Sequence, residues 1–122
     1  MSYLLDSVIV IDHFNGIESA TTFLAENGSA SAISVITRAE VLTGFDASTE
    51  PLARELLDTF PTLPITAEVA DLAASLRRTE NWKLPDALQA AIALQHGLIL
   101  VTRNTRDFRS HGDLDVLVPY RV

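Results

Sequence analysis

Residues 83–108 constrain the fold of this chain more than any other stretch. Residues 87–94 are apolar almost all round, which predicts a buried helix with Pro85 at its first position and Gly97 as its C-terminal cap. A short apolar run at 98–101 then predicts a central strand of a parallel sheet, because such strands are covered on both faces. The chain turns polar at once after this run. Active-site residues of open α/β sheets lie at the carboxyl ends of the strands. We therefore expect this segment to contribute about half of a functional site.

Strands and helices alternate along the rest of the chain. Short apolar runs predict further strands at 3–6, 32–34, 63–65 and 114–118. Helical spacing predicts helices at 18–26, 35–42, 51–60 and 67–79, with Ser34 and Thr66 as N-caps. Residues 8–11 suit a strand, or a short helix through Phe14 with Ser7 as its N-cap. The alternation predicts an α/β fold, a three-layer α/β/α sandwich with a mostly parallel sheet, in a single domain over residues 1–122.

Composition excludes several classes of function. The 122 residues contain no cysteine, which rules out disulfides, a Cys-based zinc site and a thiol nucleophile. The net charge of −7 argues against simple electrostatic binding of nucleic acid by the whole surface, but residues 77–109 carry +3 and the remainder −10. Phosphate-loop, dinucleotide and α/β-hydrolase motifs are missing from the sequence. With neither a membrane-spanning apolar run nor a basic leader, we expect a cytoplasmic protein that does not enter membranes.

Four carboxylates occupy special positions in this pattern. Asp6 ends the first strand, Glu40 lies in the helix after the second strand, Asp86 opens the buried helix, and Asp107 follows the strand at 98–101. Each could be a helix cap or half of a salt bridge, but a carboxylate among apolar neighbours is costly unless it is paired, protonated or metal-bound. Together they favour a hard divalent cation such as Mg²⁺ or Mn²⁺. Zinc is disfavoured because the three histidines show no ligand spacing.

The chain resembles the PIN-domain family, and most of all its VapC-type toxins from bacterial toxin–antitoxin pairs. The resemblance rests on L-L-D-S at Asp6, I-T-R-A-E-V-L-T-G around Glu40, K-L-P-D-A-L at Asp86 and the later T-R-N-T-R-D-F, and it runs essentially end to end. It implies an α/β sandwich that acts as a Mg²⁺- or Mn²⁺-dependent ribonuclease, with Asp6, Glu40 and Asp86 as acidic ligands. At the family's fourth acidic position this chain has Asn104, with Asp107 three residues later. Which of these two completes the site stays open.

The function predicted from this resemblance is a metal-dependent endoribonuclease toxin that cleaves RNA and is neutralised by a cognate antitoxin. The expected catalytic residues are Asp6, Glu40, Asp86 and Asp107; the expected ligands of Mg²⁺ or Mn²⁺ are Asp6, Glu40, Asp86 and Asn104; and the expected RNA-binding residues are Ser7, Arg103 and Arg106. A homodimer is expected as well. The alternative is a PIN-like interaction module with a degenerate metal site, which the asparagine at position 104 favours.

The sequence also suggests how an antitoxin would bind. A disordered tail could place an Arg or Lys among the acidic side chains and compete with the metal. Residues 8–14 and the helix that carries Leu52, Leu56 and Phe60 are possible walls of its groove, although core packing explains these apolar residues equally well.

Overall fold

The computed structural model describes residues 1–106, 108 and 112–122. Within them, a five-stranded sheet has the order β3-β2-β1-β4-β5, and every neighbouring pair of strands is parallel. The strands are β1 (Tyr3–Leu5), β2 (Ser31–Ser34), β3 (Thr62–Leu63), β4 (Ile99–Val101) and β5 (Val116–Leu117). The predicted parallel sheet is therefore confirmed.

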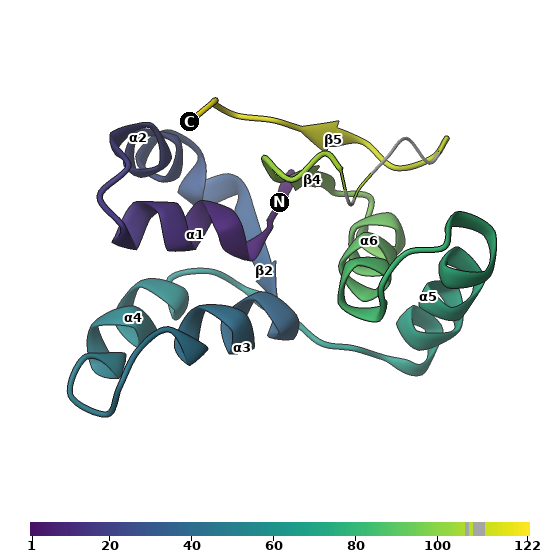
Figure 1. The fold of residues 1–122 in the computed structure, drawn as a ribbon, viewed down its shortest axis with the longest axis horizontal. Coiled ribbons are helices and arrows are strands. Elements are labelled where there is room, and N and C mark those ends of the chain that lie inside the picture. The colour runs from purple at the N-terminus through teal and green to yellow at the C-terminus, as the bar shows by residue number, and fades with distance from the viewer. Residues whose placement is uncertain (107, 109–111) are drawn as a thin grey trace.

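Helices cover both faces of this sheet. They are α1 (Ser7–Phe14), α2 (Glu18–Asn27), α3 (Val35–Thr43), α4 (Glu50–Leu57), α5 (Ala67–Glu80) and α6 (Leu84–His96), and a 3-10 turn, η1 (Gly28–Ala30), precedes β2. Figure 1 shows α5 and α6 on one side of the strands and α1 to α4 on the other. This is the three-layer sandwich that the sequence predicted. No helix of the described ranges is both long enough and apolar enough to cross a membrane.

Alternating side chains of the central strands build two separate cores. Leu4 and Leu100 pack with α5 and α6, whereas Leu5 and Val101 pack with the helices of the opposite face. All four side chains are fully buried. Successive residues of a strand point to opposite faces, so two adjacent apolar residues supply both cores at once. Burial of each such side chain stabilises the fold by roughly 1.5–3 kcal/mol.

Helix caps follow the sequence signals except at the start of α1 and at the start of α6, where Leu84 rather than Pro85 is the first helical residue. Thr66 Oγ1 accepts the backbone N–H of Val69 at 3.2 Å, and Gly97 ends α6 at a left-handed φ of 63°. Residues 8–11 are helical, but Ser7 is not the N-cap of α1. Asp6 is, because its extended backbone (φ −71°, ψ 154°) lets its own carboxylate accept the Ser7 N–H at 2.9 Å.

Element ends near the edges of the sheet differ from the predicted ranges. The edge strand β3 ends at Leu63 rather than at residue 65, because Pro64 has no N–H to donate to a ladder. The predicted last strand at 114–118 shortens to β5, which pairs with β4 at two positions. The helix predicted at 51–60 begins at Glu50 and ends at Leu57.

Candidate functional site

The order of the strands defines a crevice at the carboxyl ends of β1 and β4. The chain moves from β1 to β2 on one side and later returns to β4 on the other, which is a topological switch point. Asp6 follows β1 and Thr102 follows β4, and the Asp6 N–H donates to Val101 O at 2.9 Å. Asp6 and Thr102 therefore lie at the strand ends where open α/β sheets bind their ligands.

A cavity of about 290 Å³ opens at this crevice. Its lining combines acidic, amide, hydroxyl and basic side chains: Asp6, Ser7, Val8, Glu40, Lys83, Pro85, Asp86, Gln89 and Asn104. Three of the four predicted carboxylates are thus brought together with Asn104, from the start of α1, from α3, from the first turn of α6 and from the loop after β4. The fourth, Asp107, lies outside the described residues. The roles of all of them stay predictions.

Thr102 holds the first carboxylate in place. Its Oγ1 donates to Asp6 Oδ2 at 2.7 Å and accepts the Asn104 N–H at 2.9 Å, and its side chain is fully buried. Asp6 Oδ1 accepts the Ser7 N–H, so both of its oxygens are oriented. Sequence reasoning did not single out Thr102; a hydroxyl directly after a buried strand end was the available signal.

The pocket alters the protonation of Glu40, a residue that remains exposed to solvent. Partial desolvation in the lining raises the pKa of Glu40, a hydrogen bond from Ser7 opposes this effect, and the negative charge of Asp6 raises the pKa further. Ser7 is buried at 9% exposure and lines the same pocket as Glu40. A cation placed between Asp6 and Glu40 would favour the ionised form, because an opposite charge lowers a carboxyl pKa.

A buried polar network forms the floor of the cavity. The Gln89 amide donates to Thr37 Oγ1 at 2.9 Å and accepts from Ser34 Oγ, while Thr37 Oγ1 donates to Leu5 O at 3.1 Å. Within the described part of the chain, every buried side-chain nitrogen and oxygen has a partner. The network therefore joins α6, α3 and β1, which position Asp86, Glu40 and Asp6. Sequence reasoning missed it, although Gln89 is the one polar residue within the apolar stretch 87–94.

Arg103 contacts α1 rather than the lining of the cavity. Its Nε and Nη2 donate to the two oxygens of Asp12 at 2.6 and 2.8 Å, and the Tyr120 hydroxyl donates to the same carboxylate at 2.7 Å. Asp12 is buried, and the hydrogen bond from Arg103 is the main cause of its lowered pKa, which burial opposes. Arg106, three residues further along the chain, is exposed to solvent. The predicted contacts of both arginines with RNA stay predictions.

The donor set of the cavity fits a hydrated divalent cation. Residues 1–106, 108 and 112–122 contain no group of three or more His, Asp or Glu side chains arranged to hold a metal ion among themselves. Mg²⁺, however, usually takes one or two protein carboxylates and keeps several waters. Asp6 and Asp86 can supply the carboxylates, with Glu40 and the Asn104 amide as further oxygen donors in the same lining.

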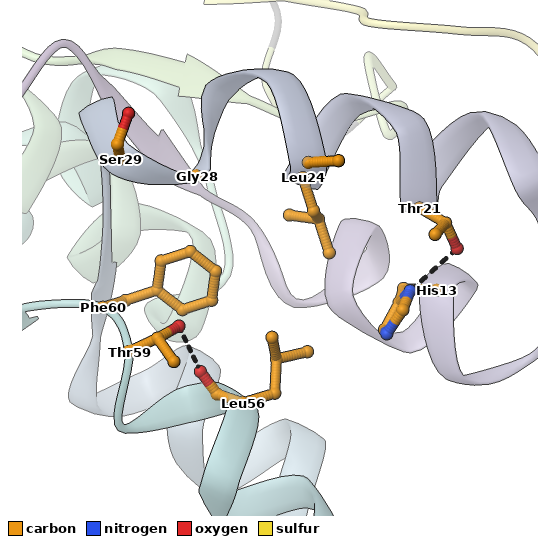
Figure 2. Close-up of a pocket in the computed structure, with 9 residues that line it drawn as sticks. His13, Thr21, Leu24, Gly28, Ser29, Leu56, Thr59 and Phe60 are labelled. Atoms are coloured by element: carbon orange, nitrogen blue, oxygen red, sulfur yellow. Dashed lines mark hydrogen bonds between the residues drawn. The ribbon is translucent and has the colours of Figure 1, made fainter.

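A second cavity, of about 430 Å³, lies between α1, α2 and the end of α4. Figure 2 shows Leu24, Leu56 and Phe60 as its apolar part, with the His13–Thr21 hydrogen bond of 2.8 Å across its other end. Two of the apolar residues that the sequence suggested as groove walls thus line one hollow, together with His13 of the stretch 8–14. Leu52 does not line it and is 64% exposed.

Comparisons with known proteins identify the family. The PIN domain model matches residues 3–114. The structure is similar to a toxin–antitoxin complex from Klebsiella pneumoniae, with 38% identity, a TM-score of 0.88, and coverage of 99% of this chain and 100% of that chain. It is also similar to FitAcB from Neisseria gonorrhoeae (25% identity, TM-score 0.78, coverage 98% and 99%). It shares its fold with VapBC2 from Rickettsia felis bound to a promoter DNA fragment (22% identity, TM-score 0.82, coverage 96% and 98%).

A search of curated proteins finds no significant match. The family model alone covers far more than half of the sequence, and the Klebsiella protein is similar from end to end. This chain therefore belongs to the PIN-domain family, as its sequence motifs predicted, and within that family it is similar to the toxins of toxin–antitoxin pairs.

Proposed function

We propose that this protein is the toxin of a toxin–antitoxin pair and acts as a Mg²⁺- or Mn²⁺-dependent endoribonuclease. PIN domains are generally nucleases, and the similar Klebsiella structure is a toxin–antitoxin complex. The observation that carries the proposal is the cavity at the switch point, where Asp6, Glu40, Asp86 and Asn104 converge from four segments of the chain. Single-stranded or looped RNA is the expected substrate, because its backbone is accessible.

The residues of the cavity would divide the work as follows. Asp6 and Asp86 would hold the metal, with Asn104 as a neutral oxygen donor. When bound, the ion would activate water and offset the charge that develops on the phosphate. Glu40, whose pKa the pocket raises, would orient that water, and Ser7 would fix the Glu40 carboxylate through its hydrogen bond. Thr102 would keep Asp6 aimed into the cavity.

An antitoxin would act at two places on this surface. Its cation would enter among Asp6, Glu40 and Asp86 in place of the metal, and its apolar anchor would fill the second cavity against Leu56 and Phe60. The two cavities differ in chemistry, so one contact supplies charge complementarity and the other buries apolar area.

The decisive experiment compares wild type with Asp86→Asn in an RNA-cleavage assay with and without Mg²⁺. We expect cleavage that requires the ion and is abolished in Asp86→Asn, while Asp71→Asn, an exposed carboxylate of α5, cleaves like wild type. Thermal melts verify that both variants fold. Undiminished cleavage by pure Asp86→Asn protein would remove this residue from the site.

A second function follows from Asn104, the neutral residue that the resemblance to the PIN family puts at the fourth acidic position. If its lower charge leaves the cavity unable to hold a metal, the protein is an interaction module. That alternative predicts no cleavage of RNA and no stabilisation by Mn²⁺, with antitoxin binding retained.

A further inference from the structure

Lys83 places a positive charge in the wall of the acidic cavity. It is the only lysine of the chain, and it lines the cavity beside Asp86 and Asn104. Its side chain is exposed, and it takes no part in the ion pairs found among the described residues, which are Arg38–Asp58, Arg54–Glu50 and Arg103–Asp12. The ammonium group can therefore reach a ligand in the cavity.

Helix geometry does not explain this lysine. Lys83 is the N-cap residue of α6 and makes no capping hydrogen bond with its side chain. A helix N-terminus carries partial positive charge and favours anions, so a cation at this position is mildly unfavourable for α6. Arg77 and Arg78 differ in this respect, because they lie in the last turn of α5, where a cation is favourable.

The turn that carries Lys83 separates the acidic cavity from a further cleft, which is basic and distinct from the cavity at His13 and Phe60. This cleft, of about 360 Å³, is lined by Arg77, Arg78, Asn81, Trp82 and Leu84, with two alanines of α5. Trp82 and Leu84 flank Lys83 in the chain, so the two hollows lie on either side of one short turn.

Contacts on both sides hold this turn in a fixed shape. Arg77 Nε donates to Trp82 O at 3.3 Å, and Asn81 adopts the left-handed conformation with φ 58°. The Trp82 ring packs edge-on against Phe108, with centroids 6.1 Å apart. Lys83, Arg77 and Arg78 are all exposed around this turn, and Leu84, which is 48% exposed, lines the cleft together with the two arginines.

We propose that Lys83 contacts a phosphate next to the cleaved bond, and that the RNA strand continues over the α5–α6 turn into the cleft lined by Arg77 and Arg78. The inference rests on the proposed nuclease function. Phosphate contacts with basic side chains supply most of the sequence-independent affinity for RNA. A basic path that begins in the wall of the cavity brings a polyanion to carboxylates that would otherwise repel it.

The test measures RNA binding and its dependence on salt. The probe is a fluorescent single-stranded RNA of about 12 nucleotides, within the usual size of a single-strand site. Asp86→Asn protein with Mg²⁺ serves as the parent, so that the probe stays intact. We expect Lys83→Met to weaken binding and to lower the slope of log K against log salt by about 0.7, the value for one phosphate contact on a single strand. Arg78→Met should do the same, whereas Lys83→Arg should retain the parent slope.

Arg121→Met is the matched control, because it removes one exposed positive charge at the C-terminal end, far from α5 in Figure 1. Its salt slope should equal that of the parent. A parent slope in Lys83→Met would make Lys83 a counter-charge for the carboxylates and would overturn the inference alone. A parent that binds no RNA, together with wild type that cleaves none, would overturn the proposed function as well.

Discussion

Replacement of Arg103 by methionine should destabilise the fold and so reveal a structural role for this residue. The side chain makes two hydrogen bonds with the buried carboxylate of Asp12, which also accepts the Tyr120 hydroxyl. Loss of one partner from a buried ion pair typically costs about 3–5 kcal/mol, because the remaining charge is left uncompensated. The Arg103 side chain is 34% exposed and Tyr120 still donates, so solvent screening lowers the expectation to about 2 kcal/mol. For a chain of this length that loss lowers Tm by about 8 °C.

Urea unfolding of a double-mutant cycle isolates the interaction. In wild type, Arg103→Met should cost about 2 kcal/mol, and in an Asp12→Asn background less than about 0.5 kcal/mol. Arg54→Met is the matched control, because its partner Glu50 lies on the surface and such pairs contribute roughly 0–1 kcal/mol. Equal, small effects of Arg103→Met in both backgrounds would refute the reasoning and leave the guanidinium available for RNA.

The same pair predicts a dependence on pH. The pKa of Asp12 is lowered in the folded protein, so the folded state binds the proton less tightly than the unfolded chain does. The stabilisation is then fully present above the ordinary pKa of 3.8 and is lost as the pH falls through the lowered value. The difference between wild type and Arg103→Met should stay constant from about pH 7 to pH 5 and shrink below about pH 4.

Three further predictions concern the acidic cavity. The pKa of Glu40 is raised, so ionisation destabilises the metal-free fold; Glu40→Gln should melt higher than wild type at neutral pH, and this gain should vanish as the pH falls below the ordinary pKa of 4.5. Equal melting temperatures of wild type and Glu40→Gln at neutral pH would mean that Glu40 is well solvated. Asn104→Asp should tighten Mn²⁺ binding, because it adds a charge to a partly desolvated pocket, and an unchanged affinity by calorimetry would place residue 104 outside the ligand set. Antitoxin affinity should fall as Mn²⁺ rises in wild type but much less in Asp6→Asn; insensitivity to Mn²⁺ in wild type would mean that the inhibitor binds elsewhere.

The sequence predicts those parts of the fold that local pattern controls. The buried helix α6 and the strand after it follow from two largely apolar stretches, and Thr66 and Gly97 mark helix ends by their own chemistry. The acidic cavity could be predicted as a set of residues because Asp6 stands at a strand end, Asp86 at a helix start, and Glu40 within the helix that follows a strand. Its internal geometry could not, since Thr102 reaches Asp6 across 96 positions.

Other contacts were hidden for the same reason. Arg103 and Tyr120 meet Asp12 over separations of 91 and 108 residues, and nothing in the local sequence of α1 distinguishes Asp12 from a solvated acid. The edge strands were predicted too long. For β3 the available signal was Pro64, which has no N–H to donate, so pairing ends at Leu63.

The Gln89 network has a consequence for how the acidic cavity meets its ligand. It ties together the three elements that carry Asp6, Glu40 and Asp86, and its Gln89 is buried in the lining of the same cavity. The free-energy cost of bringing these like charges together is therefore met during folding, and it does not recur each time a cation binds. A preorganised site of this kind loses little entropy on binding and releases its ligand without backbone rearrangement. If the proposed ligands are correct, exchange between a metal ion and a protein-borne cation would then depend on their concentrations and affinities, and neither would have to rebuild the cavity.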